Sequence, residues 1–158
     1  MDETAATTEL VITRDFDAPR EVVYRAFTDP DQLAAWFGPV GFTVPRATVD
    51  IDVRAGGHQR FTMVNDDDPS ITSPVNSTFT EVIENELLVG TETMQGFPGL
   101  PDGTVMTARI EFHDLAAEGQ PGKTRLVLRQ GPFPEAIEGG AREGWGSSFS
   151  KLDALLAS

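Results

Sequence analysis

Apolar residues near the start of the chain recur first with the spacing of a strand and then with that of a helix. Residues 10–16 alternate and predict a strand. Asp17 is a candidate N-cap for the helix that follows, with Pro19 in its first turn. The expected apolar stripe of this helix is Val22, Val23, Ala26 and Phe27.

A second, short helix is predicted from Asp29-Pro30, because this pair ends the first helix and can open another. Leu33, Trp36 and Phe37 follow at intervals that place them on one side of this helix. Gly38-Pro39 is expected to end it.

From Thr43 onward the apolar residues occur at every second position, which predicts a series of strands. Gly56-Gly57 is expected to turn the chain between the first two strands and to supply the positive φ angles of a tight hairpin. The predicted strands are 43–54, 58–64, 75–84, 87–94, 105–114 and 123–130, and the longer loops between them are 65–74, 95–104 and 116–122.

The end of the chain returns to helical spacing with Trp145, Phe149, Leu152 and Leu156. This spacing predicts a helix of about five turns with one apolar stripe. The inner face of the sheet is the only large apolar surface that the pattern offers to this stripe. We therefore predict an α+β fold in which the helices lie on one face of an antiparallel sheet.

Length and composition predict one globular domain over residues 1–158, with 1–8 as a flexible N-terminus. The chain has 158 residues, of which 39% are hydrophobic and 23% are charged. Its net charge of −13 argues against nucleic acid or an anionic membrane surface as a partner.

The sequence shows no targeting segment, no membrane-spanning segment and no cysteine. The acidic N-terminus lacks the apolar segment of a signal peptide, and the longest apolar stretch, around Leu87-Leu88-Val89, is much too short to span a membrane. The chain has no cysteine, so no disulfide is expected. We therefore expect a cytoplasmic protein that does not insert into a membrane.

Metal, nucleophile and phosphate chemistry find little support. His58 and His113 are the only histidines, and a zinc site would need three convergent protein ligands. Residues 146–149 (GSSF) lie in the predicted terminal helix and do not form a nucleophile elbow. There is also no glycine-rich phosphate loop. The sequence predicts no bound metal and no cofactor.

General acid–base chemistry has one weak candidate. The period of two places Arg109, Glu111 and His113 opposite the apolar residues of 105–114, so we expect these three in solvent, because burying unpaired charge is costly. Glu81 shares a predicted face with Phe79. Inside an apolar pocket the pKa of Glu81 would be raised, which suits a general acid.

Four segments, taken in order, carry a resemblance to a known family. Residues 16–24 (FDAPREVVY) match an opening f-x-A-P-x-x-V motif, and 29–39 (DPDQLAAWFGP) match D-P-x-x-L-x-x-W-x-x-P. Residues 52–57 (DVRAGG) resemble a D-x-R-x-G-G hairpin, and 144–156 resemble a closing helix that begins with Gly-Trp. Together they resemble the Hsp90-ATPase-activator homologue (AHSA1-like) family of the START-like, or Bet v 1-like (SRPBCC), superfamily.

The resemblance implies a helix-grip fold, in which a curved antiparallel sheet of about six strands wraps a long C-terminal helix and leaves an apolar cavity. Phe97 and Leu100 would then form a lid; the alternative is an ordinary Pro/Gly turn. The expected cavity residues, which could equally form a close-packed core, are Trp36, Phe37, Phe61, Met63, Phe79, Met106, Ala108, Ile110, Phe112, Trp145, Ser148, Phe149 and Leu152.

The function implied by the resemblance is open between three classes, since a fold does not fix a function. The favoured class is a binding protein for a small hydrophobic molecule such as a lipid. One alternative is a protein that binds an Hsp90-type chaperone and stimulates its ATPase. The other is an enzyme similar to polyketide cyclases/dehydratases or a small hydrolase. A homodimer is compatible with each of them.

Overall fold

The computed structural model describes residues 6–158 and has three α-helices and one eight-stranded sheet. The sheet is antiparallel, with strand order β1-β8-β7-β6-β5-β4-β2, and β3 also pairs with β4. The elements are β1 (Thr7–Phe16), α1 (Arg20–Thr28), α2 (Pro30–Trp36), β2 (Phe42–Thr43), β3 (Asp50–Ile51), β4 (His58–Asn65), β5 (Thr72–Ile83), β6 (Leu87–Met94), β7 (Thr104–Asp114), β8 (Thr124–Pro134) and α3 (Glu135–Leu156).

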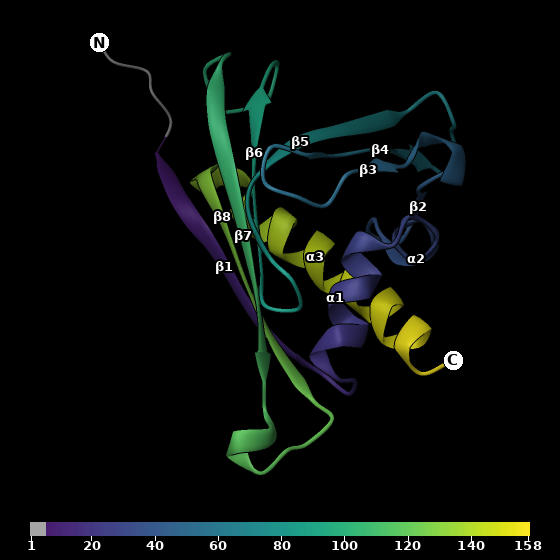
Figure 1. Ribbon diagram of the computed structural model, residues 1–158. Coiled ribbons are helices and arrows are strands. Elements are labelled where there is room, and N and C mark those ends of the chain that lie inside the picture. The colour runs from purple at the N-terminus through teal and green to yellow at the C-terminus, as the bar shows by residue number, and fades with distance from the viewer. Residues whose placement is uncertain (1–5) are drawn as a thin grey trace.

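The sheet bends around α3, and all three helices lie on its inner side (Figure 1). Strands β1, β8 and β7 form one limb of the bend, and β5 and β4 run across the helices as the other limb. The predicted α+β helix-grip fold is therefore confirmed, with eight strands where about six were expected. Among the described residues, no helix is both long enough and apolar enough to cross a membrane.

Two short strands occur where the sequence predicts one long strand over 43–54. Pro45 has no N–H to donate to a sheet, and its carbonyl oxygen accepts the N–H of Thr48 in a 3-10 turn. This turn leaves only the two-residue strands β2 and β3. The prediction of a continuous strand is wrong because the local turn at Pro45 overrides the alternation.

Smaller boundary differences occur elsewhere in the sheet. The loop expected at 65–74 is shorter, because Pro74 already pairs with Thr62 in the β4–β5 ladder. Thr7 and Thr8, expected in a flexible N-terminus, pair with Pro134 and Phe133. The remaining part of that expectation, residues 1–5, lies outside the described residues.

The start of α1 differs from its prediction. Asp17 does not cap it: the N-cap is Pro19, and no side-chain hydrogen bond closes the first turn. Val22, expected in the apolar stripe, is 37% exposed, and Tyr24 is buried on the inner side instead. The helix begins at Arg20, beyond reach of the expected cap.

The helix α2 begins as the sequence predicts. One carboxylate oxygen of Asp29 accepts the backbone N–H groups of Asp31 and Gln32 at 2.9 and 3.2 Å. Pro30 occupies the first turn, where its missing N–H costs no hydrogen bond. Leu33 and Trp36 are then buried against the core.

The core joins the three helices through aromatic rings. The Trp36 ring lies between Phe27 of α1 and Phe149 of α3, with ring centroids 4.9 and 6.2 Å away. Phe149 also contacts Phe16 of β1 at 5.5 Å. These contacts tie the C-terminal half of α3 to the sheet.

The N-terminal half of α3 is held less tightly. Among the described helix residues the buried ones are Ser148, Phe149 and Leu152, which all lie in the C-terminal half. Gly139, Gly140 and Gly144 occupy the N-terminal half, and Gly146 directly follows it. Glycine lowers helix stability by roughly 1 kcal/mol relative to alanine, so this half is both poorly anchored and poorly helix-forming.

Replacing the exposed glycines of α3 is expected to stabilise the protein. A Cβ added at Gly139 or Gly140 meets no atom within 4 Å. The double variant Gly139→Ala/Gly140→Ala should therefore raise the free energy of unfolding by about 1–2 kcal/mol, measured by urea unfolding. As a contrast, Gly122→Ala should destabilise, because Gly122 has φ +76°. No gain from the double variant would contradict this account of α3.

Candidate functional site

The inner face of the sheet is defined by the pairing of its central strands. Ala108 of β7 lies opposite Gly90 of β6 and Gln130 of β8. Ile110 lies opposite Leu88 and Leu128, both of which are buried in the core. The apolar residues of 105–114 therefore face the helices, as their alternation predicts.

The residues expected to line a cavity fall into two groups by exposure. Those of the first group are fully packed: Trp36, Phe61, Phe79, Met106, Phe112, Ser148, Phe149 and Leu152. Those of the second group are half-buried: Phe37, Met63, Ala108, Ile110 and Trp145. The first group therefore belongs to the close-packed core, and the second group is partly exposed, with most of its members packed against that core. A cavity lined by the second group stays a prediction.

The second group, together with the half-buried Val75 of β5, is here called the inner strip. Helix α3 packs on β1, β8 and α2, and α1 packs on β7. The half-buried side chains of the inner strip show that these helices do not completely cover the inner face of β5, β6 and β7. Phe37 and Trp145 stand at one side of the inner strip, with ring centroids 5.6 Å apart. The inner strip is an apolar surface inside the bend of the sheet.

Few polar side chains accompany the inner strip. The amide oxygen of Gln130 accepts the indole N–H of Trp145 at 3.3 Å. The Ser148 hydroxyl donates to the carbonyl oxygen of Gly144 within its own helix, at 3.0 Å. Both contacts satisfy the polar groups internally, which suits an apolar binding surface.

Glu92 is a half-buried ionisable side chain that sequence analysis did not single out. Glu92 is two and four residues from Gly90 and Leu88 on β6, so its position lies on the same, inner face of the strand. It lies opposite the buried Met106. Strands β5 and β6 stop pairing at Thr78 and Thr91, just before Glu92. One carboxylate oxygen fills the gap by accepting the backbone N–H of Asn76 at 2.7 Å. The alternation of inward and outward residues along β6 could have revealed this inward position.

The electrostatic setting of Glu92 is unusual for this acidic chain. Burial raises the pKa of Glu92 above its ordinary value, and the hydrogen bond from Asn76 only partly offsets this. Among the described residues Glu92 takes part in no ion pair. It is therefore a partly desolvated carboxylate without a cationic partner among the described residues.

Glu81, the weak catalytic candidate, is exposed. The β5–β6 register shifts between Phe79 and Glu81, where Thr80 forms a bulge. Beyond the bulge Val82 takes the inner face and Glu81 faces solvent. The expectation of an inward Glu81 is wrong, because one extra residue reverses the alternation.

The segment expected to form a lid packs on the end of the sheet. Leu100 is buried with Leu10, Met106 and Phe133 in a second small cluster. The Phe97 ring contacts that of Phe133, with centroids 6.0 Å apart. The segment therefore covers the end of the sheet next to Met106, and a movement of this segment stays a prediction.

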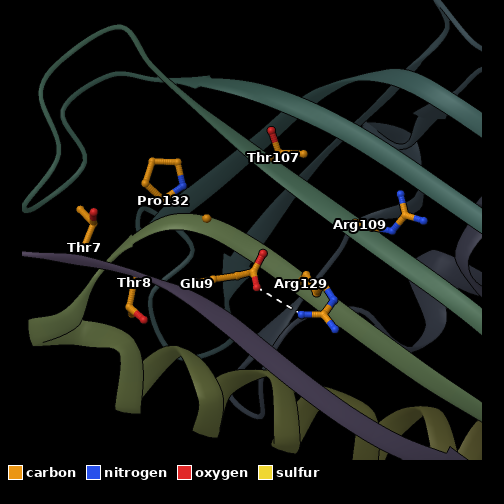
Figure 2. Close-up of a pocket in the computed structure, with 8 residues that line it drawn as sticks. Thr7, Thr8, Glu9, Thr107, Arg109, Arg129 and Pro132 are labelled. Atoms are coloured by element: carbon orange, nitrogen blue, oxygen red, sulfur yellow. Dashed lines mark hydrogen bonds and ion pairs between the residues drawn. The ribbon is translucent and has the colours of Figure 1, made fainter.

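A hollow of about 490 Å³ lies on the opposite, outer face of the sheet (Figure 2). It is open to solvent, and its lining combines hydroxyl, guanidinium and carboxylate groups. The lining residues are Thr7, Thr8, Glu9, Thr107, Arg109, Arg129, Gly131 and Pro132. Sequence analysis did not predict this hollow, because its residues come from three strands distant in sequence.

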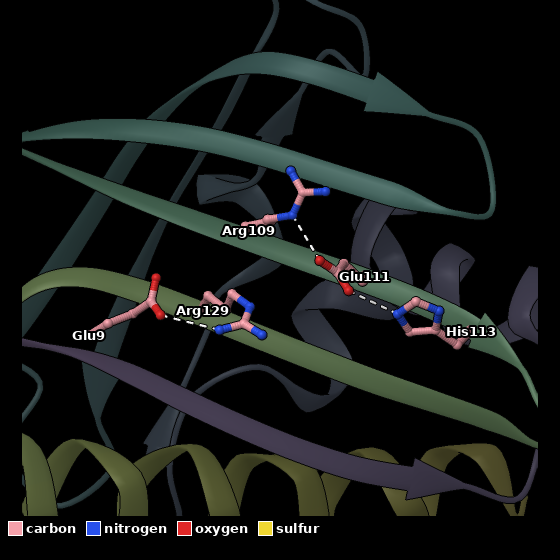
Figure 3. Close-up of polar contacts among 5 residues, drawn as sticks. All are labelled: Glu9, Arg109, Glu111, His113 and Arg129. Atoms are coloured by element: carbon pink, nitrogen blue, oxygen red, sulfur yellow. Dashed lines mark hydrogen bonds and ion pairs between the residues drawn. The ribbon is translucent and has the colours of Figure 1, made fainter.

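The charges around this outer hollow neutralise one another (Figure 3). Glu111 accepts a hydrogen bond from Arg109 Nε at 2.8 Å and lies 2.8 Å from His113 Nε2. These two contacts lower the pKa of Glu111. Arg129 pairs with Glu9 at 3.2 Å. The predicted outward orientation of Arg109, Glu111 and His113 is confirmed.

Metal chemistry has no geometric basis in the part of the chain that the structure describes. Within residues 6–158, no three His, Cys, Asp or Glu side chains gather closely enough to hold an ion. His58 and His113 lie on different strands, β4 and β7.

Comparison with known proteins places this architecture in a family. The family model "Activator of Hsp90 ATPase homolog 1-like protein" matches residues 17–157. The chain belongs to this AHSA1-like family. The resemblance seen in the four sequence segments is thereby confirmed over most of the chain. A search of curated proteins found no match.

Solved bacterial structures share the AHSA1-like fold. A protein from Chromobacterium violaceum is 27% identical with a TM-score of 0.79, and the match covers 95% of this chain and 97% of that one. A protein from Nitrosomonas europaea is 24% identical with a TM-score of 0.76, over 99% and 97% of the two chains. The AHSA1 protein of Silicibacter pomeroyi is 22% identical with a TM-score of 0.73, over 95% and 98%.

Proposed function

We propose that this AHSA1-like protein binds a small apolar molecule on the inner strip, between α3 and strands β5 to β7. One observation carries the proposal: mid-strand, inner-face positions such as Ala108 and Ile110 stay half-buried, whereas the core around Trp36 is fully packed. Small-molecule sites are concave and mostly apolar, with few polar groups. The inner strip has this composition.

The weakly anchored half of α3 supports the same function. It carries three glycines and contributes Trp145 to the inner strip. A helix segment with little buried surface can shift at low cost to admit a guest, because local opening depends on how much is packed. The C-terminal half, anchored by Phe149 and Leu152, would stay in place.

A titration with the neutral fluorescent probe N-phenyl-1-naphthylamine tests the proposal. We expect saturable binding with enhanced emission, and the variant Ala108→Phe should weaken it at least tenfold by filling the inner strip. Thr107→Phe is the matched control, because Thr107 is the adjacent residue of β7 and faces outward. Both variants should keep a cooperative thermal transition. Absence of saturable binding, or equal effects of the two variants, would overturn the proposal.

The family description names a second function. Because the matching model is described as an Hsp90 ATPase activator homologue, binding to an Hsp90-type chaperone is the alternative proposal. A coupled ATPase assay with the chaperone from the same source tests it directly. Stimulation that survives Ala108→Phe would favour the chaperone function over the binding of a small molecule.

A further inference from the structure

Glu92 lies where the inner strip meets the second buried cluster, which consists of Leu10, Leu100, Met106 and Phe133. Its register partner Met106 belongs to the second cluster, and Trp145 packs against that cluster from α3. Gly90, two residues before Glu92, brings no side chain of its own into the space next to Ala108. A molecule lying on the inner strip would therefore have its apolar body near Ala108 and one end near Glu92.

The Glu92 carboxylate has unused bonding capacity. A carboxylate accepts several hydrogen bonds through its two oxygens. Oε2 accepts the N–H of Asn76, and within residues 6–158 no hydrogen bond reaches Oε1. Burial removes part of the water around this carboxylate, whereas Oε1 is not among the buried atoms without a partner and so stays open to solvent or to a ligand. The raised pKa of Glu92 is consistent with this loss.

A cation compensates such a group better than a neutral donor does. Hydrogen bonds between an ammonium and a carboxylate are roughly twice as strong as neutral ones. The net charge of −13 also raises the local concentration of cations and lowers that of anions. Methionine side chains next to Glu92, Met94 on the same strand and Met106 opposite, adapt to apolar guests of varied shape.

We propose that the guest of the inner strip is a lipophilic amine, whose ammonium group pairs with Glu92 while its apolar body covers Ala108 and Trp145. This inference rests on the proposed function, because it names the class of molecule that the same site takes. Arg109 and Arg129 do not compete with the ligand for the Glu92 carboxylate, since they lie on the outer face and are paired with Glu111 and Glu9.

Calorimetry with two nearly isosteric probes tests the inference on the unmodified protein. 2-Naphthylmethylamine carries an ammonium group, and 2-naphthylmethanol carries a hydroxyl at the same position. We expect the amine to bind at least tenfold more tightly than the alcohol at low salt, and the preference to shrink as salt is added. Equal affinities would overturn the inference.

Two variants test whether Glu92 causes the preference for the amine over the alcohol. Glu92→Gln should remove it, weakening the amine at least tenfold and changing the alcohol less than twofold, because the amide oxygen can still accept the Asn76 N–H. Glu81→Gln is the matched control, since it removes the same charge from an exposed position on the adjacent strand. A preference that persists in Glu92→Gln, or disappears equally in both variants, would overturn the inference.

The two proposals fail in different ways. If the alcohol binds and the amine gains nothing, the inner strip is an apolar site and the role of Glu92 is refuted. If neither naphthalene probe nor N-phenyl-1-naphthylamine binds, the proposed function is refuted and the inference falls with it.

Discussion

Trp36→Ala is expected to lower the free energy of unfolding by about 4 kcal/mol, because truncating a buried tryptophan leaves a large cavity. Trp36 is 0% exposed, and its indole N–H donates to the carbonyl oxygen of Ala26 at 2.8 Å. Its ring joins α1 and α3 through Phe27 and Phe149. Urea unfolding followed by far-UV circular dichroism measures the loss.

Trp36→Phe separates packing from hydrogen bonding at this position. The phenyl ring keeps part of the aromatic contact, but the carbonyl oxygen of Ala26 loses its indole donor. We expect a loss of about 2 kcal/mol, intermediate between the wild type and Trp36→Ala. If Trp36→Ala cost less than about 1 kcal/mol, the aromatic contacts of Trp36 with Phe27 and Phe149 would not be the centre of the core.

Gly57→Ala is expected to cost about 3 kcal/mol, because a Cβ at this position would overlap the backbone. The added atom would overlap the Asp52 carbonyl oxygen and lie 3.0 Å from the carbonyl oxygen of Arg54. The backbone cannot yield easily, since the Gly57 carbonyl oxygen accepts the N–H of Phe79 at 2.9 Å. Thermal and urea unfolding of the variant check this.

Gly56→Ala is the matched control in the same turn. Gly56 has φ +85°, and an added Cβ would come no closer than 4.0 Å to the Arg54 side chain. Its substitution costs conformational energy alone, about 1 kcal/mol. A Gly56→Ala variant less stable than Gly57→Ala would show that backbone conformation, and not space, decides this hairpin.

These two glycines also show a limit of sequence analysis. The pair was expected to supply positive φ angles, and this expectation is confirmed for Gly56 and wrong for Gly57. Gly57 is needed because the chain of residues 52–54 passes directly beside it. A turn motif identifies the place of the bend, but close approach of two backbones depends on how the folded hairpin docks.

Strand prediction succeeded where a single period extends over many residues. The predicted strand 105–114 corresponds to β7, Thr104–Asp114, because apolar alternation there matches the buried inner face along its length. The prediction for 43–54 failed because the short turn after Pro45 interrupts the alternation without erasing it. Alternation alone does not reveal whether the backbone donors are used in a sheet.

In the candidate site, too, some residues were predicted from the sequence and one was not. Phe37, Met63, Ala108, Ile110 and Trp145 were expected near a cavity, and the structure places them half-buried inside the bend. Glu92 was missed, although its parity with Leu88 was visible, because the divergence of β5 and β6 cannot be inferred from either strand alone. That divergence is what leaves its carboxylate beside the inner strip.

The amino-acid sequence by itself determined the α+β class, the inward face of β7, the capped start of α2, the amphipathic last helix and the family. Periodicity, capping and motif spacing are local, so they survive without knowledge of the partners. Only the tertiary structure decided the outward position of Glu81, the inward gap at Glu92 and the loose half of α3. Each of these depends on strand register or helix docking, which join residues far apart along the chain.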